Sequence, residues 1–124
     1  PGETLLAITE EADILNFEKD DVIYAQGDIA DGLYIIAQGE VALVRDKNTL
    51  IDYKQYDFFG FMGIIQNKPY YASAKALTAC QLLCLDKVTF DRILEDVPDV
   101  LMSITRVMAS YLAKIMVKER LIFP

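Results

Sequence analysis

The sequence predicts a mainly β fold with flanking helices. The expected architecture is an antiparallel β-roll of the jelly-roll (double-stranded β-helix) kind, followed by a C-terminal helix pair. Three observations predict it. From Ile14 to Leu85 the apolar residues fall in short or alternating runs, the period of half-buried strands. Turn signals rich in Gly, Asp and Asn separate these runs. After residue 86 the apolar residues recur every three or four positions, the period of a helix.

The elements follow in order along a chain of 124 residues, the usual size of one domain. We expect residues 1–124 to be one domain cut from a longer protein. Helical spacing over residues 3–12 predicts the remnant of a helix, and residues 13–86 predict the roll. Residues 87–120 predict two helices, with a break at Asp96 and Pro98. The strands of the roll are expected at 14–17, 22–25, 33–37, 41–44, 50–53, 70–77 and 81–85.

Composition narrows the class of function. Nineteen acidic and twelve basic residues give a formal charge of -7, so a phosphate backbone is repelled and this segment is not expected to bind nucleic acid. The chain has no histidine, the commonest metal ligand and acid–base side chain, which argues against an enzyme. No apolar run approaches the roughly 20 residues that span a bilayer, so membrane insertion by this segment is not expected.

Two cysteines, Cys80 and Cys84, lie in one predicted strand. Four residues along a strand place them on one face about 13 Å apart, too far for a disulfide. A zinc or iron–sulfur site would need further ligands, so burial in the core is the favoured interpretation. Two free thiols suit a reducing compartment and predict a cytoplasmic location.

A glycine-containing motif occupies residues 26–41. Its glycines, Gly27, Gly32 and Gly39, lie where tight turns between strands are expected to require a positive φ. This motif resembles the early signature of cyclic-nucleotide-binding domains, the family of kinase regulatory subunits, catabolite activator proteins and nucleotide-gated channels. The resemblance implies the β-roll fold and says little about the ligand.

A second motif, at residues 59–74, resembles the phosphate-binding cassette of that family. Gly60, Gly63 and Pro69 agree with its pattern of a glycine entering a short helix, then a proline and a strand. In such a cassette, backbone N–H groups at the helix start point at the cyclic phosphate. By this resemblance the ligand-binding positions are Gly60, Phe61, Met62, Gly63, Tyr70, Tyr71, Ala72 and Ser73.

The cassette departs from the family at two positions. Phe61 replaces the glutamate that takes the ribose hydroxyl, and Tyr70 replaces the arginine that pairs with the phosphate. Each charge-assisted hydrogen bond contributes about 1.5–3 kcal/mol, so losing both weakens binding by roughly two to four orders of magnitude. Lys68 is expected in a turn and Lys75 is expected to point outward, so neither replaces the arginine. Ser73 matches a small hydroxyl residue of the family.

These observations predict a non-catalytic regulatory module of a larger signalling, transport or transcription protein. It has no cofactor, and its cyclic nucleotide binding is weak or lost. One alternative is a sensor of a different small ligand, which would use the cassette amides and the aromatic residues Phe59, Phe61, Tyr70 and Tyr71; these rings would otherwise be core. A second is a ligandless dimerisation domain. If Phe61 and Tyr70 close the site, both are buried and little room remains for a nucleotide-sized ligand.

The helix expected at 98–120 carries a wide apolar stripe. One side of the stripe is expected to cover the roll, through Leu101, Ile104, Met108 and Leu112. The other side is left for a second chain, through Val100, Val107, Tyr111 and Ile115. The sequence thus favours a homodimer through this helix. In the alternative, the whole stripe packs within one domain.

Overall fold

The computed structural model describes Glu10, residues 12–96, and residues 99, 102, 105–106, 109–110 and 112–113. The described part forms two four-stranded sheets, in the orders β1-β8-β3-β6 and β2-β7-β4-β5, and two helices. The elements are β1 (Asp13–Phe17), β2 (Val22–Tyr24), β3 (Gly32–Gln38), β4 (Val41–Arg45), β5 (Asn48–Tyr53), β6 (Phe58–Phe59), α2 (Phe61–Gln66), β7 (Ser73–Ala76), β8 (Cys80–Asp86) and α3 (Lys87–Asp96).

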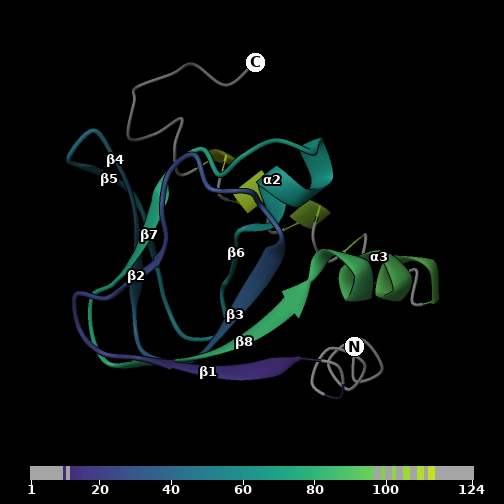
Figure 1. Ribbon diagram of the computed structural model, residues 1–124, viewed down its shortest axis with the longest axis horizontal. Coiled ribbons are helices and arrows are strands. Elements are labelled where there is room, and N and C mark those ends of the chain that lie inside the picture. The colour runs from purple at the N-terminus through teal and green to yellow at the C-terminus, as the bar shows by residue number, and fades with distance from the viewer. Residues whose placement is uncertain are drawn as a thin grey trace.

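The two sheets face one another and form an antiparallel roll, which confirms the predicted fold class (Figure 1). Strand β3 lies between β8 and β6, and its residues Gly32 to Ile36 are buried. In β7 the burial alternates, with Ala74 and Ala76 inside, so Lys75 points outward as its position predicts. The largest fully buried side chains are Leu33, Ile36, Val41, Phe59, Leu82, Leu85 and Phe90.

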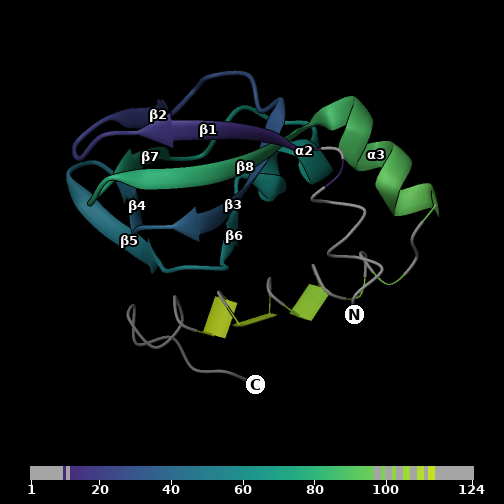
Figure 2. The same ribbon diagram turned by 90° about the horizontal axis from the view of Figure 1, so that it is seen from below.

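The helices cover one end of the roll. Helix α3 follows β8 directly, and the Asp86 carboxylate accepts a hydrogen bond from the Thr89 backbone N–H at 2.7 Å. This N-terminal cap holds the pKa of Asp86 below its ordinary value. The Lys87 N–H donates to the Asp31 carbonyl, which ties α3 to the loop before β3. Figure 2 shows the described residues between 102 and 113 beside the roll, outside both sheets.

The strand boundaries agree with the predicted ones to within one or two residues, except at two places. The two-residue strand β6 was not predicted, because two residues are too few to show an alternation. The strand predicted at 70–77 spans only Ser73–Ala76. The backbone of Tyr70 is instead hydrogen-bonded to the turn after β2. Its N–H donates to the Asp28 carbonyl, and its carbonyl accepts from the Gly27 N–H, both at 2.9 Å. Most residues of the helices predicted at 3–12 and 98–120 lie outside the described residues.

The turns between the sheets depend on residues with positive φ. Gly27 (φ 90°) and Gly39 (φ 104°) adopt it, as predicted. The prediction for Gly32 is wrong, because this residue lies in β3 and has no positive φ. There a Cβ atom would meet the Cys84 Sγ at 3.2 Å, so the position is constrained by close packing.

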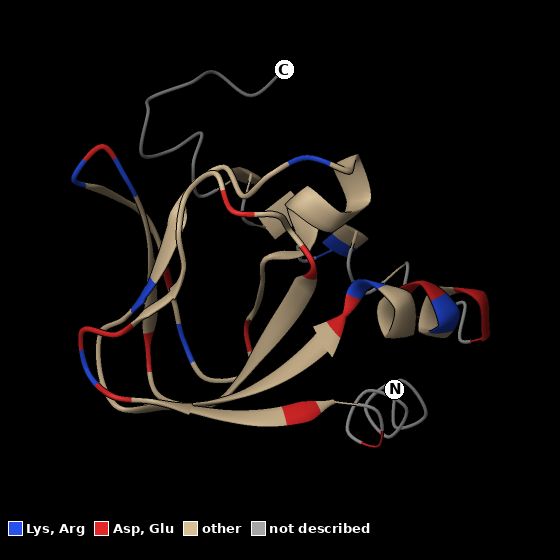
Figure 3. Ribbon diagram, viewed as in Figure 1, with Lys and Arg blue, Asp and Glu red and all other residues tan. Residues whose placement is uncertain are grey.

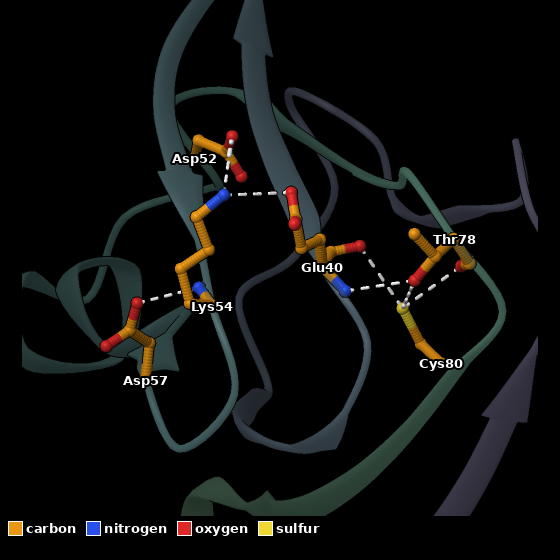
Figure 4. Close-up of polar contacts among 6 residues, drawn as sticks. All are labelled: Glu40, Asp52, Lys54, Asp57, Thr78 and Cys80. Atoms are coloured by element: carbon orange, nitrogen blue, oxygen red, sulfur yellow. Dashed lines mark hydrogen bonds and ion pairs between the residues drawn. The ribbon is translucent and has the colours of Figure 1, made fainter.

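Polar contacts hold three loops together where the chain passes from β3 to β4 (Figure 4). The Lys54 ammonium bridges the carboxylates of Glu40 at 3.0 Å and Asp52 at 3.3 Å. The Lys54 backbone N–H donates to Asp57 at 2.8 Å, and the Glu40 N–H donates to the Thr78 hydroxyl at 3.1 Å. The surface ion pairs contribute little alone, so the backbone-anchored bonds fix these loops.

The two cysteines are free and lie on β8. Cys80 is buried, and its thiol donates to the Glu40 carbonyl at 3.2 Å. Burial raises the pKa of the half-buried Cys84 thiol. Within the described ranges, no three His, Cys, Asp or Glu side chains gather as metal ligands would. Nor does that part of the chain include a helix with the length and hydropathy needed to cross a membrane.

Replacing Gly39 with alanine should destabilise the fold more than replacing Gly27. Both changes strain a positive φ, which costs about 1–2 kcal/mol. At Gly39 the new Cβ would also lie 2.6 Å from the Ala79 carbonyl oxygen and 2.7 Å from the Cys80 Sγ, whereas at Gly27 it meets nothing within 4 Å. Urea unfolding of both variants measures the difference. Equal losses of stability would contradict the close packing at Gly39.

Candidate functional site

The cassette is built by a sharp entry and a sharp exit of the short helix α2. Gly60 enters it at φ 87°, where a Cβ atom would lie 3.0 Å from the Gly32 carbonyl oxygen. Asn67 ends it in the left-handed conformation at φ 54°, a common way to stop a helix. The Lys68 N–H then donates to the Gly63 carbonyl at 2.9 Å, which turns the chain towards Pro69. The order of elements expected for the cassette is therefore present.

Tyr70 points into the roll. Its ring stacks on Tyr24 with the centroids 3.6 Å apart and the planes 10° from parallel. Its hydroxyl donates to the Gly32 carbonyl at 2.7 Å and accepts from the Gly32 N–H at 3.2 Å. Tyr70 is 5% exposed and Phe61 is 3% exposed, so the predicted burial of both residues is confirmed.

Stacked and tilted rings continue from Tyr70 through the core. Tyr24 contacts Tyr34 and Phe59, with centroids 5.8 and 6.1 Å away, and Tyr53 stacks on Phe59 at 5.3 Å. The interpretation of the aromatic residues as core is thus right for Phe59, Phe61 and Tyr70. It is wrong for Tyr71, which is 65% exposed.

Burial makes these tyrosines neutral hydrogen-bonding groups. Removal from water raises the pKa of Tyr70 to about 12. The same cause raises the pKa values of Tyr24, Tyr34 and Tyr53 well above the ordinary tyrosine value. All four hydroxyls stay protonated at neutral pH, so the position of the family's arginine carries no charge.

Arg45 is a basic residue beside the cassette that was not predicted from the sequence. Its guanidinium lies 4.0 Å from the centroid of the Tyr71 ring, and it donates to the Tyr71 carbonyl at 2.6 Å. The pairing of β4 with β7, in which Val44 faces Ser73, brings Arg45 to this place. The two residues are 26 positions apart, so no local pattern in the sequence indicates the contact.

Other polar residues in or next to the cassette either contact other parts of the roll or are exposed. The Ser73 hydroxyl accepts from the Gln26 N–H at 2.9 Å, which joins β7 to the turn after β2. Lys75 lies 3.7 Å from Asp20 in an exposed ion pair. Lys68 is exposed in the turn after α2, as predicted. Neither lysine occupies the place of the missing arginine.

A cavity of about 820 Å³ lies over the cassette. The hypothesis that Phe61 and Tyr70 close the site and leave little room is therefore wrong, although both residues are buried, because Tyr70 turns into the roll and leaves this space open. The predicted site residues Gly60, Phe61, Met62, Gly63, Tyr70, Tyr71 and Ala72 line the cavity, whereas Ser73 does not. The other walls come from Tyr24, Leu43, Leu50, Ile51, Tyr53, Gln66, Lys68, Pro69, Thr105, Ala109 and Leu112.

The fold and the cavity define a β-roll domain with a candidate small-ligand site, and comparison with known proteins identifies its family. The family model "Cyclic nucleotide-binding domain" matches residues 14–97. The chain belongs to the cyclic nucleotide-binding domain family.

The similar proteins include kinase regulatory subunits and a transcriptional regulator. A cAMP-dependent protein kinase regulatory subunit from Hypocrea atroviridis is 30% identical over 94 residues, which are 76% of this chain and 20% of that protein. A CRP-like cAMP-activated global transcriptional regulator from Mycobacterium tuberculosis is 26% identical over 115 residues, 89% of this chain and 51% of that protein. The chain thus spans a fifth to a half of the length of these relatives.

A solved structure shares the fold. The Thermus thermophilus catabolite activator protein superposes with a TM-score of 0.84 at 25% identity, over 97% of this chain and 58% of that one.

Changing Tyr70 to phenylalanine should lower the free energy of unfolding by about 1–3 kcal/mol, because it leaves the buried N–H and carbonyl of Gly32 without the hydroxyl. The ring stays to stack on Tyr24. Tyr71→Phe is the matched control, since that side chain is 65% exposed and should change stability by less than about 0.5 kcal/mol. Thermal or urea unfolding compares the two. Similar effects of both changes would contradict the anchoring role of Tyr70.

Proposed function

We propose that this domain is a non-catalytic regulatory module in which cyclic nucleotide binding by the family's mode is weak or lost. The observation that carries the proposal is the state of Tyr70. Where the family has an arginine for the phosphate, this chain has a buried, neutral phenol whose hydroxyl is bonded to Gly32. A cyclic phosphate would be desolvated there without a counter-charge, which is costly.

Phe61 supports the same conclusion at the ribose. It replaces a carboxylate with a hydrocarbon ring that is 3% exposed, so the ribose hydroxyl would lose its charged acceptor. Arg45 does not compensate, because its guanidinium is held against Tyr71 and its carbonyl. The family's frame is kept, and the two charged contacts are absent.

The names of the relatives support a regulatory role. They are a kinase regulatory subunit and a transcriptional regulator, in which the matched region is one part of a longer chain. We therefore place this domain within a larger signalling, transport or transcription protein of the cytoplasm, with no cofactor and no enzymatic activity. With a formal charge of -7, this segment would not itself contact nucleic acid. Without an apolar run of about 20 residues, it would not insert into a membrane.

Calorimetric titration with cyclic AMP and cyclic GMP should show no saturable binding at micromolar concentrations, because both charged contacts are missing. The matched region of the Hypocrea atroviridis regulatory subunit, titrated under the same conditions, is the positive control. A well-defined micromolar isotherm for either nucleotide with this chain would overturn the proposal.

A second candidate function is a sensor of a different small ligand. The cavity of about 820 Å³ favours it, since a purely structural closed site would have filled this space with side chains. Under this hypothesis the domain is still regulatory, but it responds to a small ligand other than a cyclic nucleotide.

We further propose a homodimer through the segment 98–120, by its apolar residues at 100, 107, 111 and 115. Of the described residues in this segment, Met102 is 54% exposed, so apolar surface is available there. Light scattering should then give twice the 14.0 kDa mass of one chain.

The variant Val107→Glu should convert this dimer to monomer, because a carboxylate would be buried between the two helices. Val88→Glu, at a 78% exposed position of α3, is the control and should leave the mass unchanged. A 14.0 kDa species over a wide concentration range would rule out the dimer.

A further inference from the structure

The walls of the cavity are largely apolar. Leu43, Leu50 and Ile51 of the second sheet line it together with the cassette, and its described lining residues include no acidic side chain. Its volume of about 820 Å³ lies within the range of about 300–1,000 Å³ typical of ligand sites. Apolar walls of this extent favour a ligand with a lipophilic body.

Lys68 is the charged residue among the described residues that line this cavity. The cassette, residues 59–74, contains no other charged side chain, and many of the other charges lie on α3 and on turns of the roll (Figure 3). Lys68 is exposed, lines the cavity, and makes no ion pair with the described residues. Its backbone is fixed by the bond to Gly63. A cation on a fixed turn beside an apolar space complements one anionic group.

The Tyr24 hydroxyl is a second polar feature of the cavity. Tyr24 is 7% exposed and lines the cavity, and its hydroxyl makes no hydrogen bond with the described residues. The hydroxyl of its stacking partner Tyr70 is instead bonded to Gly32. Buried hydroxyls nearly always have a partner, so an acceptor on a ligand would complete this one.

We propose that the cavity binds a lipophilic monoanion: an apolar aromatic or aliphatic body within the walls, an acceptor group at Tyr24, and one anionic group at Lys68. This inference rests on the sensor form of the proposed function and specifies the ligand class of the same site. A cyclic nucleotide, with its polar ribose, does not belong to this class.

A matched pair of fluorescent probes tests the proposal. Dansyl-labelled undecanoic acid has a lipophilic body, sulfonyl acceptors and one carboxylate, and its methyl ester lacks only the charge. The acid should bind one-to-one with a blue-shifted emission and about tenfold more tightly than the ester. Lys68→Gln should abolish the difference between the two probes, and Tyr24→Phe should weaken both about fivefold.

Narrowing the cavity provides the structural arm of the test. Leu43→Phe should weaken both probes at least about tenfold, whereas Val44→Phe, on the opposite face of β4 and outside the cavity lining, should not. Circular dichroism checks that each variant is folded. If Leu43→Phe does not fold, Ala109→Phe narrows the cavity from the segment after α3, where the side chain is exposed.

The outcomes separate this inference from the proposed function. No saturable binding of either probe, or probe binding that persists in folded cavity-narrowing variants, would overturn the ligand class and leave the loss of nucleotide binding intact. Equal affinity for acid and ester would overturn the role of Lys68 and hence the monoanion. A micromolar cyclic AMP isotherm beside normal probe binding would overturn the proposed function while supporting the cavity.

Discussion

The exchange of two hydrogen bonds between Tyr70 and Gly32 is the contact on which the arrangement of the site depends. One hydroxyl satisfies both the N–H and the carbonyl of a buried residue at the start of β3. The backbone of Tyr70 is bonded at the same time to the turn of residues 27–28. The exit of the cassette is therefore fixed to two loops of the roll, and the ring has no freedom to turn into the ligand space.

This anchoring explains how the domain keeps the family's frame without its charges. In a binding-competent cassette the arginine gains its stability from the phosphate, whereas Tyr70 gains its stability from the protein itself. The stacked rings of Tyr24 and Tyr70 both line the cavity. The residue that lacks the phosphate contact is thus held by the protein at the edge of an open space whose walls are largely apolar.

The sequence predicted what depends on local pattern. Alternation of apolar residues located the strands, and the spacing of Gly60, Gly63 and Pro69 located the cassette. The sequence did not predict features that depend on contacts between residues far apart in the chain. The inward turn of Tyr70 requires Gly32, 38 positions away, and the placement of Arg45 requires the register of β4 on β7. The open cavity follows from these long-range contacts, so local pattern left open whether Phe61 and Tyr70 close the site.

The position of the cavity gives it a physical route to regulation. Its walls belong to the cassette, to the second sheet and to Thr105, Ala109 and Leu112, which follow α3 in the chain. A lipophilic body inside would bury apolar surface on all three at once, at about 25 cal/mol for each Å² removed from water. Ligand binding would then favour the arrangement in which the segment after α3 lies against the roll. The segment through which we propose that chains pair would thereby respond to the occupancy of the cavity.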